Sequence, residues 1–403
     1  GSNMSEDCLN LNVFTGSTPS GTSRLPVLVW IHGGAYTNGS GSIPWYHGSA
    51  LASRGAVVVS INYRLGAFGF LGEGNYGTLD MISALRWVNR NIAAFGGDVN
   101  NVTIFGESAG GSAVVSLMSS PEAKGLFHKV WAMSPSIGQL RTLPRAQELQ
   151  TQFLELAEVS SIDEVRAMPL DDVLTAQAKQ MALPALIFDF YTPTAGGEAL
   201  PFDILSAAAA SALPLVLGSN HDEDRLWSAM DPLQAEFDQH DWERVSGEVF
   251  GDRAADARSV YERLRPTETP KQLISSVRTD TAFRQRAQRL AEQHASRSNP
   301  TWMYWFTWAT PAFGGILGSC HALDVPFAFD NLSAPGTDML TGDGSERSGI
   351  AKRFADEIAQ FAKSSEPTWP AFDLAIRSTL EINDEMAVLR DPEKEIREIF
   401  LSL

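Results

Sequence analysis

The residues with the clearest chemical potential in this sequence surround one serine, in the run Gly106-Glu107-Ser108-Ala109-Gly110. An apolar, β-branched stretch ends just before this run, and small and apolar residues follow it. The pattern G-x-S-x-G between a strand and a helix is typical of a nucleophile elbow, where glycines leave room for a strained turn that presents the serine. The alternative is a turn that serves packing alone, because five such residues are a weak signal by themselves. The strand–turn–helix context favours the nucleophile.

A serine hydroxyl is a poor nucleophile at neutral pH, so it needs a base, and the base needs an acid that orients it. A structural or surface role is the default for each of the seven histidines, which are His32, His47, His128, His221, His240, His294 and His321. His321 differs from the others because it lies in a glycine-rich segment, residues 314–327, after an apolar run near the C-terminus. His32 follows an earlier apolar run and suits a loop whose backbone N–H groups stabilise a developing negative charge.

Three neighbouring acids, Asp222, Glu223 and Asp224, follow another apolar run and are candidates for the orienting carboxylate. Only one of them is expected inside, because several negative charges in one dry site raise each other's pKa strongly. The other acids are expected nearer solvent or paired with Arg225 or another base. His221 precedes the three acids and is expected at the surface, because adjacent side chains on a turn rarely face each other.

Seven segments carry a family resemblance, and they occur in order from about Glu6 to the C-terminus: "SEDCLNLNVF", "WIHGGAYTNG", "SINYRLGAFGFL", "ALRWVNRNIAAFGGDVNNVTIFGESAGGS", "SPEAKGLFHKV", "LPLVLGSNHDE" and "LGSCHALDVPFAF". Together they resemble successive signatures of the type-B carboxylesterases, the cholinesterase-like branch of the α/β hydrolases. The resemblance implies an α/β-hydrolase fold, in which helices flank a central, mostly parallel sheet. It also implies that the protein hydrolyses carboxylic esters through an acyl-enzyme, with no metal or cofactor.

Matched residue by residue, the resemblance implies that Ser108 is the nucleophile, His321 the general base and Glu223 the acid. Glu107 matches a family carboxylate beside the nucleophile that is thought to bind water or cationic groups.

An oxyanion hole is implied at the backbone N–H groups of Gly34, Ala35 and Ala109. Gly33 is an alternative donor in the ligand-free loop.

Departures from the family pattern spare every catalytic group. Asp80-Met81 stands where Asp-Gln is usual, and Val99 stands where Pro is common. Asp224 replaces a glycine after the acid, and "AMSPS" replaces Gln-Ser-Gly-Ser. The family normally carries a further N-terminal segment with a disulfide loop, which would pair with Cys8. Its lack here predicts an uncovered sheet edge, a more open pocket and self-association, because unpaired strand edges accept partners.

The elements that must position these residues alternate between short apolar runs and helical patterns. Residues 25–31, 56–62, 129–133 and 213–219 read as strands, and apolar residues from Leu79 to Phe95 recur at helical spacing up to Gly96-Gly97. The aromatic run 301–308 is expected to be a central strand rather than an aromatic-binding box, and a hairpin is expected at 383–385. Helical insertions at about 140–181 and 232–297 are expected to form pocket walls within one domain, residues 1–403. Gly1–Asn3 are typical of a tag remnant.

Composition excludes several classes of partner. The chain has 403 residues, 44% hydrophobic and 20% charged, with net charge −17, and its Lys and Arg form no basic stripe. Nucleic acid and anionic membrane surfaces are therefore poor partners, and no apolar run is long enough for a membrane span. The only cysteines, Cys8 and Cys320, indicate neither a disulfide framework nor a zinc site, which favours a cytoplasmic location. A small ester and a second copy of the chain remain as partners.

Three other functions are compatible with parts of the sequence. Residues 72–77 ("GEGNYG") match G-x-G-x-x-G, but a dinucleotide site would need them to join a strand directly to a helix. A non-catalytic adhesion or scaffold protein could share the fold, although this chain keeps all three catalytic groups. An amidase or carbamate hydrolase could use the same triad.

Overall fold

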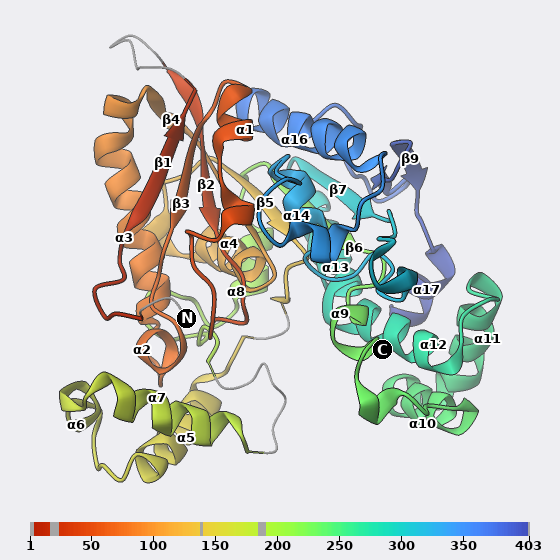
Figure 1. Ribbon diagram of the computed structural model, residues 1–403, viewed down its shortest axis with the longest axis horizontal. Helices are drawn as coiled ribbons and strands as arrows, with labels where there is room; N and C mark the ends of the chain where they lie inside the picture. Colours follow the sequence, from red (N-terminus) through yellow and green to blue (C-terminus); the bar gives the residue numbers. More distant parts are fainter. Residues whose placement is uncertain (1–3, 17–23, 138–139, 184–190, 402–403) are drawn as a thin grey trace. The chain divides into compact units, whose positions relative to one another are not determined.

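A computed structural model describes residues 4–16, 24–137, 140–183 and 191–401 (Figure 1). The chain divides into two compact units. The first covers Gly1–Ala132 and Ser136–Pro214, and the second covers Met133–Pro135 and Leu215–Leu403. No helix among the described ranges is both long enough and apolar enough to cross a membrane.

The strands of the first unit are β1 (Leu11–Thr15), β2 (Leu25–Ile31), β3 (Val57–Ile61), β4 (Gly97–Glu107) and β5 (Lys129–Met133), whose last residue belongs to the second unit. Their order is β1-β3-β2-β4-β5. β2 pairs in parallel with β3 and β4, whereas the outermost strand β1 is antiparallel to β3. β3 is buried along its whole length and β2 beyond its first residue, as expected for strands covered on both faces. Self-association through the β1 edge stays a prediction.

The helices of the first unit are η1 (Pro44–Tyr46), α1 (Ser49–Ser53), α2 (Gly66–Phe70), α3 (Tyr76–Asn91), η2 (Ile92–Phe95), α4 (Ala109–Ser119), η3 (Pro121–Ala123), α5 (Leu143–Leu156), α6 (Ile162–Ala167), α7 (Leu170–Met181) and α8 (Ile204–Ala209). The predicted stop at Gly96 is confirmed, because this residue ends η2 with a φ of 84° that favours glycine. The segment expected to be the first helical insertion contains α5 to α7, of which α5 and α7 lie side by side (Figure 1).

The G-x-G-x-x-G run does not have the setting of a dinucleotide site. It follows α2, a short helix, and leads through Asn75 (φ 46°) into α3. A dinucleotide fold needs the glycine-rich turn directly after the first strand of a βαβ unit. The glycine-rich run therefore joins two helices and does not form a dinucleotide site.

The strands of the second unit are β6 (Leu215–Asn220), β7 (Thr301–Phe306), β8 (Ser378–Ile382) and β9 (Ala387–Arg390), in that order across the sheet. β7 pairs in parallel with β6 and β8, and β9 is antiparallel to β8. β7 is buried along its whole length, so its aromatic residues form a central strand as predicted. The predicted hairpin joins β8 to β9.

The helices of the second unit are α9 (Arg225–Ser228), η5 (Pro232–Gln234), α10 (Gln239–Phe250), η6 (Gly251–Arg253), α11 (Ala254–Leu264), α12 (Pro270–Thr279), η7 (Asp280–Arg284), α13 (Gln285–Ala295), η8 (Ala312–Gly315), α14 (Asp324–Ala328), α15 (Thr337–Thr341), α16 (Arg347–Ser364) and α17 (Lys394–Phe400). Helices α10 to α12 and α17 share a buried apolar cluster that includes Trp242, Tyr261, Ile274 and Phe400 (Figure 1). In both units, mostly parallel strands are accompanied by helices, which confirms the predicted α/β class.

The start of α4 packs closely against the end of β2, so alanine should be tolerated less well at Gly110 in α4 than at Gly247 in α10. A Cβ at Gly110 would overlap the Ile31 carbonyl oxygen, whereas a Cβ at Gly247 in α10 meets no atom within 4 Å. Alanine is the better helix former by about 0.5–1 kcal/mol when nothing clashes. We therefore expect Gly247→Ala to raise the free energy of unfolding and Gly110→Ala to lower it, as measured by urea denaturation. Equal effects of the two substitutions would contradict this packing.

Candidate active site

Ser108 occupies the turn between β4 and α4. Its backbone has φ 58° and ψ −120°, a conformation that non-glycine residues adopt only at a cost of about 1–3 kcal/mol. Glycine is needed on the strand side, because a Cβ at Gly106 would lie 2.6 Å from the carbonyl oxygens of both Ile31 and Gly110. The predicted strand–turn–helix context is therefore confirmed, and the serine is held in a strained turn with its side chain partly exposed.

The loop after β2 turns its backbone sharply beside this serine. Gly34, Ala35 and Tyr36 have successive φ values of 110°, 52° and 58°. The Gly34 carbonyl accepts hydrogen bonds from the N–H groups of Thr37 and Asn38 at 3.0 Å. Within the described ranges, no acceptor engages the N–H groups of Gly34 and Ala35. This loop therefore offers backbone donors of the kind that stabilise an oxyanion.

Gly33 and Ala109 bring the loop and the helix start close to the serine. A Cβ at Gly33 would lie 3.0 Å from Ser108 Cβ and 2.6 Å from the Glu107 carbonyl oxygen, so only glycine fits there. Ala109 is the first residue of α4, and its N–H is one of those that lack an acceptor inside a helix. Glu107 is the last residue of β4 and is buried beside Gly33. Gly33, Glu107 and Ala109 therefore lie next to Ser108 in one unit, and the loop from Gly33 continues into Gly34 and Ala35.

His32 supports this loop from inside. Its side chain is buried, its Nδ1 lies 2.8 Å from the Gly33 carbonyl oxygen, and its ring stacks on Tyr63 at 4.5 Å. Burial lowers the pKa of His32 to about 4, against the opposing effect of the hydrogen bond to Gly33. The ring is therefore neutral at ordinary pH, and its Nδ1–H donates to the Gly33 carbonyl, which can only accept.

The second unit contains a carboxylate–imidazole pair. Glu223 has no solvent exposure, and its Oε2 lies 2.6 Å from His321 Nδ1. Its Oε1 accepts hydrogen bonds from the Ser134 hydroxyl at 2.5 Å and from the Asn220 N–H at 2.7 Å. Burial of a carboxyl group without such partners would cost several kcal/mol, on the order of the loss for an unpaired buried polar group. The choice of Glu223 from the three neighbouring acids therefore agrees with the geometry of this unit.

Ser134 and Asn220 were missed as site residues from the sequence. Asn220 ends β6, and Ser134 follows β5 with a φ of 42°. The available signal was their position, because the carboxyl ends of neighbouring parallel strands meet at one edge of a sheet. Ser134 lies in the segment "AMSPS", which departs from the family pattern.

Aromatic rings flank the His321 imidazole. The Trp227 and Phe283 rings lie 4.9 Å and 4.8 Å from it, and they stack on each other at 6.2 Å. The Trp227 side chain is 41% exposed although it is large and apolar. The imidazole therefore borders an apolar surface that is open to solvent.

The expectation for His221 was wrong. His221 Nδ1 lies 3.0 Å from Asp222 Oδ1, and its ring stacks on Trp305 at 5.0 Å. The two adjacent side chains face each other because the Trp305 ring and the tight turn after β6 hold the imidazole against the carboxylate. Asp222 is buried rather than near solvent, and it pairs with Arg225 at 3.0 Å, one of the two expected alternatives.

Asp224 is only partly buried, unlike the buried acids Asp222 and Glu223. Its Oδ2 has no hydrogen-bond partner among the described residues, and burial raises the pKa of its carboxyl group. Its N–H donates to the Thr279 hydroxyl, away from the loop that carries His321.

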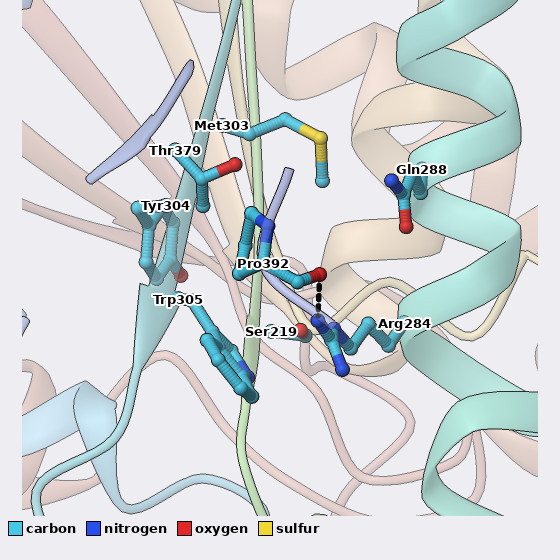
Figure 2. Close-up of a pocket in the computed structure, with 8 residues that line it drawn as sticks. All are labelled: Ser219, Arg284, Gln288, Met303, Tyr304, Trp305, Thr379 and Pro392. Atoms are coloured by element: carbon cyan, nitrogen blue, oxygen red, sulfur yellow. Dashed lines mark hydrogen bonds between the residues drawn. The ribbon is translucent and has the colours of Figure 1, made fainter. Parts of the chain in front are cut away.

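No group of three or more His, Cys, Asp or Glu side chains within the described ranges could hold a metal ion. The cavity in Figure 2, lined by residues that include Arg284, Trp305 and Pro392, has a volume of about 10 Å³. That is space for one water molecule and not for an organic ligand. The structure thus assembles two groups of predicted residues, one around Ser108 in the first unit and one around Glu223 and His321 in the second.

Comparisons with known proteins agree with one another. A family profile described as "Carboxylesterase family" matches residues 1–398. The para-nitrobenzyl esterase of Bacillus subtilis is 37% identical over 98% of this chain and 83% of that protein. The cocaine esterase of Oryctolagus cuniculus is 33% identical over 96% of this chain and 77% of that protein. A crystal structure of a Geobacillus stearothermophilus carboxylesterase aligns with a TM-score of 0.87 at 33% identity, covering 99% of this chain and 86% of that one.

The neutral state of His32 makes stability depend on pH. Because the folded protein lowers the pKa of His32 from 6.5 to about 4, the unfolded chain binds the extra proton between these values, and stability falls as pH falls. We expect His32→Asn, whose amide can still donate to Gly33, to reduce the loss of unfolding free energy between about pH 7 and pH 4.5 by about 2 kcal/mol. Urea denaturation at both pH values measures this. The exposed His240→Asn is the control, and an equal reduction there would contradict the assignment.

Proposed function

Because the chain belongs to the carboxylesterase family, which hydrolyses carboxylic esters by a serine mechanism, we propose that Ser108, His321 and Glu223 are its catalytic triad. The observation that carries this proposal is the buried Glu223–His321 pair at 2.6 Å, together with the strained serine turn. The predicted α/β-hydrolase fold is confirmed by the solved carboxylesterase structures, and the protein acts on small ester molecules.

The proposed reaction begins with attack of Ser108 Oγ on the ester carbonyl carbon. His321 Nε2 takes the hydroxyl proton as the C–O bond forms, and Glu223 at Nδ1 holds the imidazole in the required tautomer and stabilises its positive charge. The N–H groups of Gly34, Ala35 and Ala109 then stabilise the tetrahedral oxyanion. His321 returns the proton to the leaving alcohol, which leaves an acyl-enzyme on Ser108.

Water completes the cycle in the same way. His321 takes a proton from the water molecule as its oxygen attacks the acyl carbon, and the proton then returns to Ser108 Oγ as the acid product leaves. The buried Glu107 carboxylate beside Ser108 is proposed to bind water or a cationic group of the substrate. His32 supports the oxyanion donors through its contact with the Gly33 carbonyl.

We further propose that residues 1–403 act as one hydrolase domain. The argument is chemical, since the proposed nucleophile comes from the first unit and its base and acid come from the second. The alternative of a non-catalytic scaffold gains no support, because the serine turn would carry backbone strain without a benefit.

The triad assignment predicts the rank of five variants. We expect Ser108→Ala and Glu223→Gln to stay folded and to lower kcat by about 10³–10⁴-fold, because the first loses the nucleophile and the second loses the counter-charge and tautomer control. Asp222→Asn and Asp224→Asn should each cost far less, and Gly247→Ala serves as a neutral control. Hydrolysis of p-nitrophenyl butyrate, with circular dichroism to check folding, measures this rank. Near-native activity of Ser108→Ala would refute the assignment of Ser108 as the nucleophile.

We expect the leaving group to set the rate of hydrolysis, so that an ester reacts faster than the matched amide. An amide leaves as an amine only after protonation, so a matched anilide presents a higher barrier to the same residues than an ester does. We expect p-nitrophenyl butyrate to be hydrolysed by orders of magnitude faster than p-nitrobutyranilide, with both activities lost in Ser108→Ala. Comparable rates would instead favour an amidase.

A further inference from the structure

Asp222 joins the loop that carries Glu223 to the loop that carries His321. Its N–H donates to the Ser319 carbonyl at 2.9 Å, and its Oδ2 accepts from the Ser319 N–H at 2.9 Å. The two loops therefore exchange a reciprocal pair of hydrogen bonds one residue before the acid and two residues before the base. The His321 N–H adds a third link to the Glu223 carbonyl at 3.2 Å.

The other carboxylate oxygen of Asp222 faces an imidazole and a guanidinium group. Oδ1 lies 3.0 Å from His221 Nδ1 and 3.0 Å from the Arg225 guanidinium, which also pairs with Glu268 at 2.5 Å. Burial alone would raise the pKa of Asp222, but His221, Arg225 and the Ser319 N–H together lower it to about 2. The carboxylate is therefore ionised throughout the neutral range.

The end of β7 forms hydrogen bonds with both loops. The Phe306 carbonyl at the end of β7 accepts hydrogen bonds from the His221 N–H at 2.9 Å and the Ser319 hydroxyl at 2.7 Å. The Trp305 ring contacts the His221 ring and also the Arg284 guanidinium, 4.1 Å from the ring centre. Arg284 in turn donates to the Pro392 carbonyl at 2.9 Å (Figure 2). The end of β7 therefore contacts both loops, and Asp222 links the two loops to each other.

We propose that Asp222 is a positioning residue that sets the distance between the catalytic carboxylate and imidazole. It touches neither substrate nor reacting atoms, and it acts by locking the Ser319 backbone, and hence His321, to the turn that ends in Glu223. This inference rests on the proposed roles of Glu223 and His321.

The essential feature is the hydrogen bond that Oδ2 accepts, rather than the charge on Asp222. An asparagine has the same shape and keeps an oxygen acceptor for the Ser319 N–H, whereas an alanine loses it. A small displacement of a catalytic group lowers the rate of the chemical step far more than it changes ground-state substrate binding. Loss of the hydrogen bond between the Ser319 N–H and Asp222 Oδ2 should therefore lower kcat and leave KM nearly unchanged.

The first experiment compares three variants by ester hydrolysis and thermal unfolding. We expect Asp222→Ala to lower kcat by about 100-fold with KM changed by no more than about threefold, and Asp222→Asn to recover at least about tenfold of that loss. Asp224→Ala is the control, because its backbone bonds to Thr279 and not to the His321 loop. If Asp222→Asn falls as far as Asp222→Ala, or if Asp222→Ala keeps its kcat, the proposal is overturned.

A second pair of variants displaces the carboxylate without removing it. A Cβ at Gly318 (φ 57°) would overlap Asp222 Oδ2, whereas a Cβ at Gly315 (φ 82°) comes no nearer than 3.9 Å to any atom. Both alanines carry the strain of a positive φ. We expect Gly318→Ala to lower kcat and Gly315→Ala to leave it unchanged. This pair decides the question if Asp222→Ala does not fold, and equal kcat values for the two would overturn the proposal.

Ser108→Ala separates this inference from the proposed function. If Ser108→Ala is inactive while Asp222→Ala and Gly318→Ala retain full kcat, only the positioning role fails. If Ser108→Ala is active, the catalytic assignment itself fails, and the positioning role fails with it.

Discussion

A carboxyl group with no access to water needs hydrogen-bond partners at both of its oxygens, and this constraint governs the surroundings of Glu223. One oxygen faces the His321 imidazole, and the other accepts from Ser134 and from the Asn220 backbone. The donors come from the end of β5, from the end of β6 and from the loop after β7. β6 and β7 must therefore pair in register before Glu223 and His321 can meet, since a shift would leave a buried charge without a partner.

The serine turn obeys a different constraint, which is steric. Ser108 accepts an unfavourable backbone conformation, and the helix that follows starts against the carbonyl of Ile31. Only residues without a side chain fit at Gly106 and Gly110, and only glycine fits at Gly33 beside Ser108. Strain of this kind persists because β4, which pairs with β2, holds one end of the turn and α4 holds the other. The stability of the sheet thus offsets the strain that keeps the hydroxyl presented.

In the second unit, single arginine side chains pair with more than one carboxylate. Asp222, Glu268 and Glu393 all lie close to arginines, with Arg225 between Asp222 and Glu268 and Arg265 between Glu268 and Glu393. Asp222 stays ionised although it is next to Glu223 in the chain, because its charge is balanced by His221 and Arg225 on the other side of the turn. Two adjacent carboxylates can thus both be buried, and each has its own set of partners.

Sequence patterns predicted the α/β class and the strands around Ser108, and the family resemblance of the same sequence pointed to the proposed nucleophile, acid and base. These features are local, since G-x-S-x-G, the apolar runs and the glycine-rich segment before His321 each act through neighbouring residues. The contacts of Ser134, His221 and Asp222 were decided only by the tertiary structure. Ser134 lies 89 residues from Glu223, and Ser319 lies 97 residues from Asp222, so no local pattern indicates these hydrogen bonds. The pairing of His221 with its own neighbour also escaped the sequence, because it depends on a Trp305 ring that arrives from a different strand.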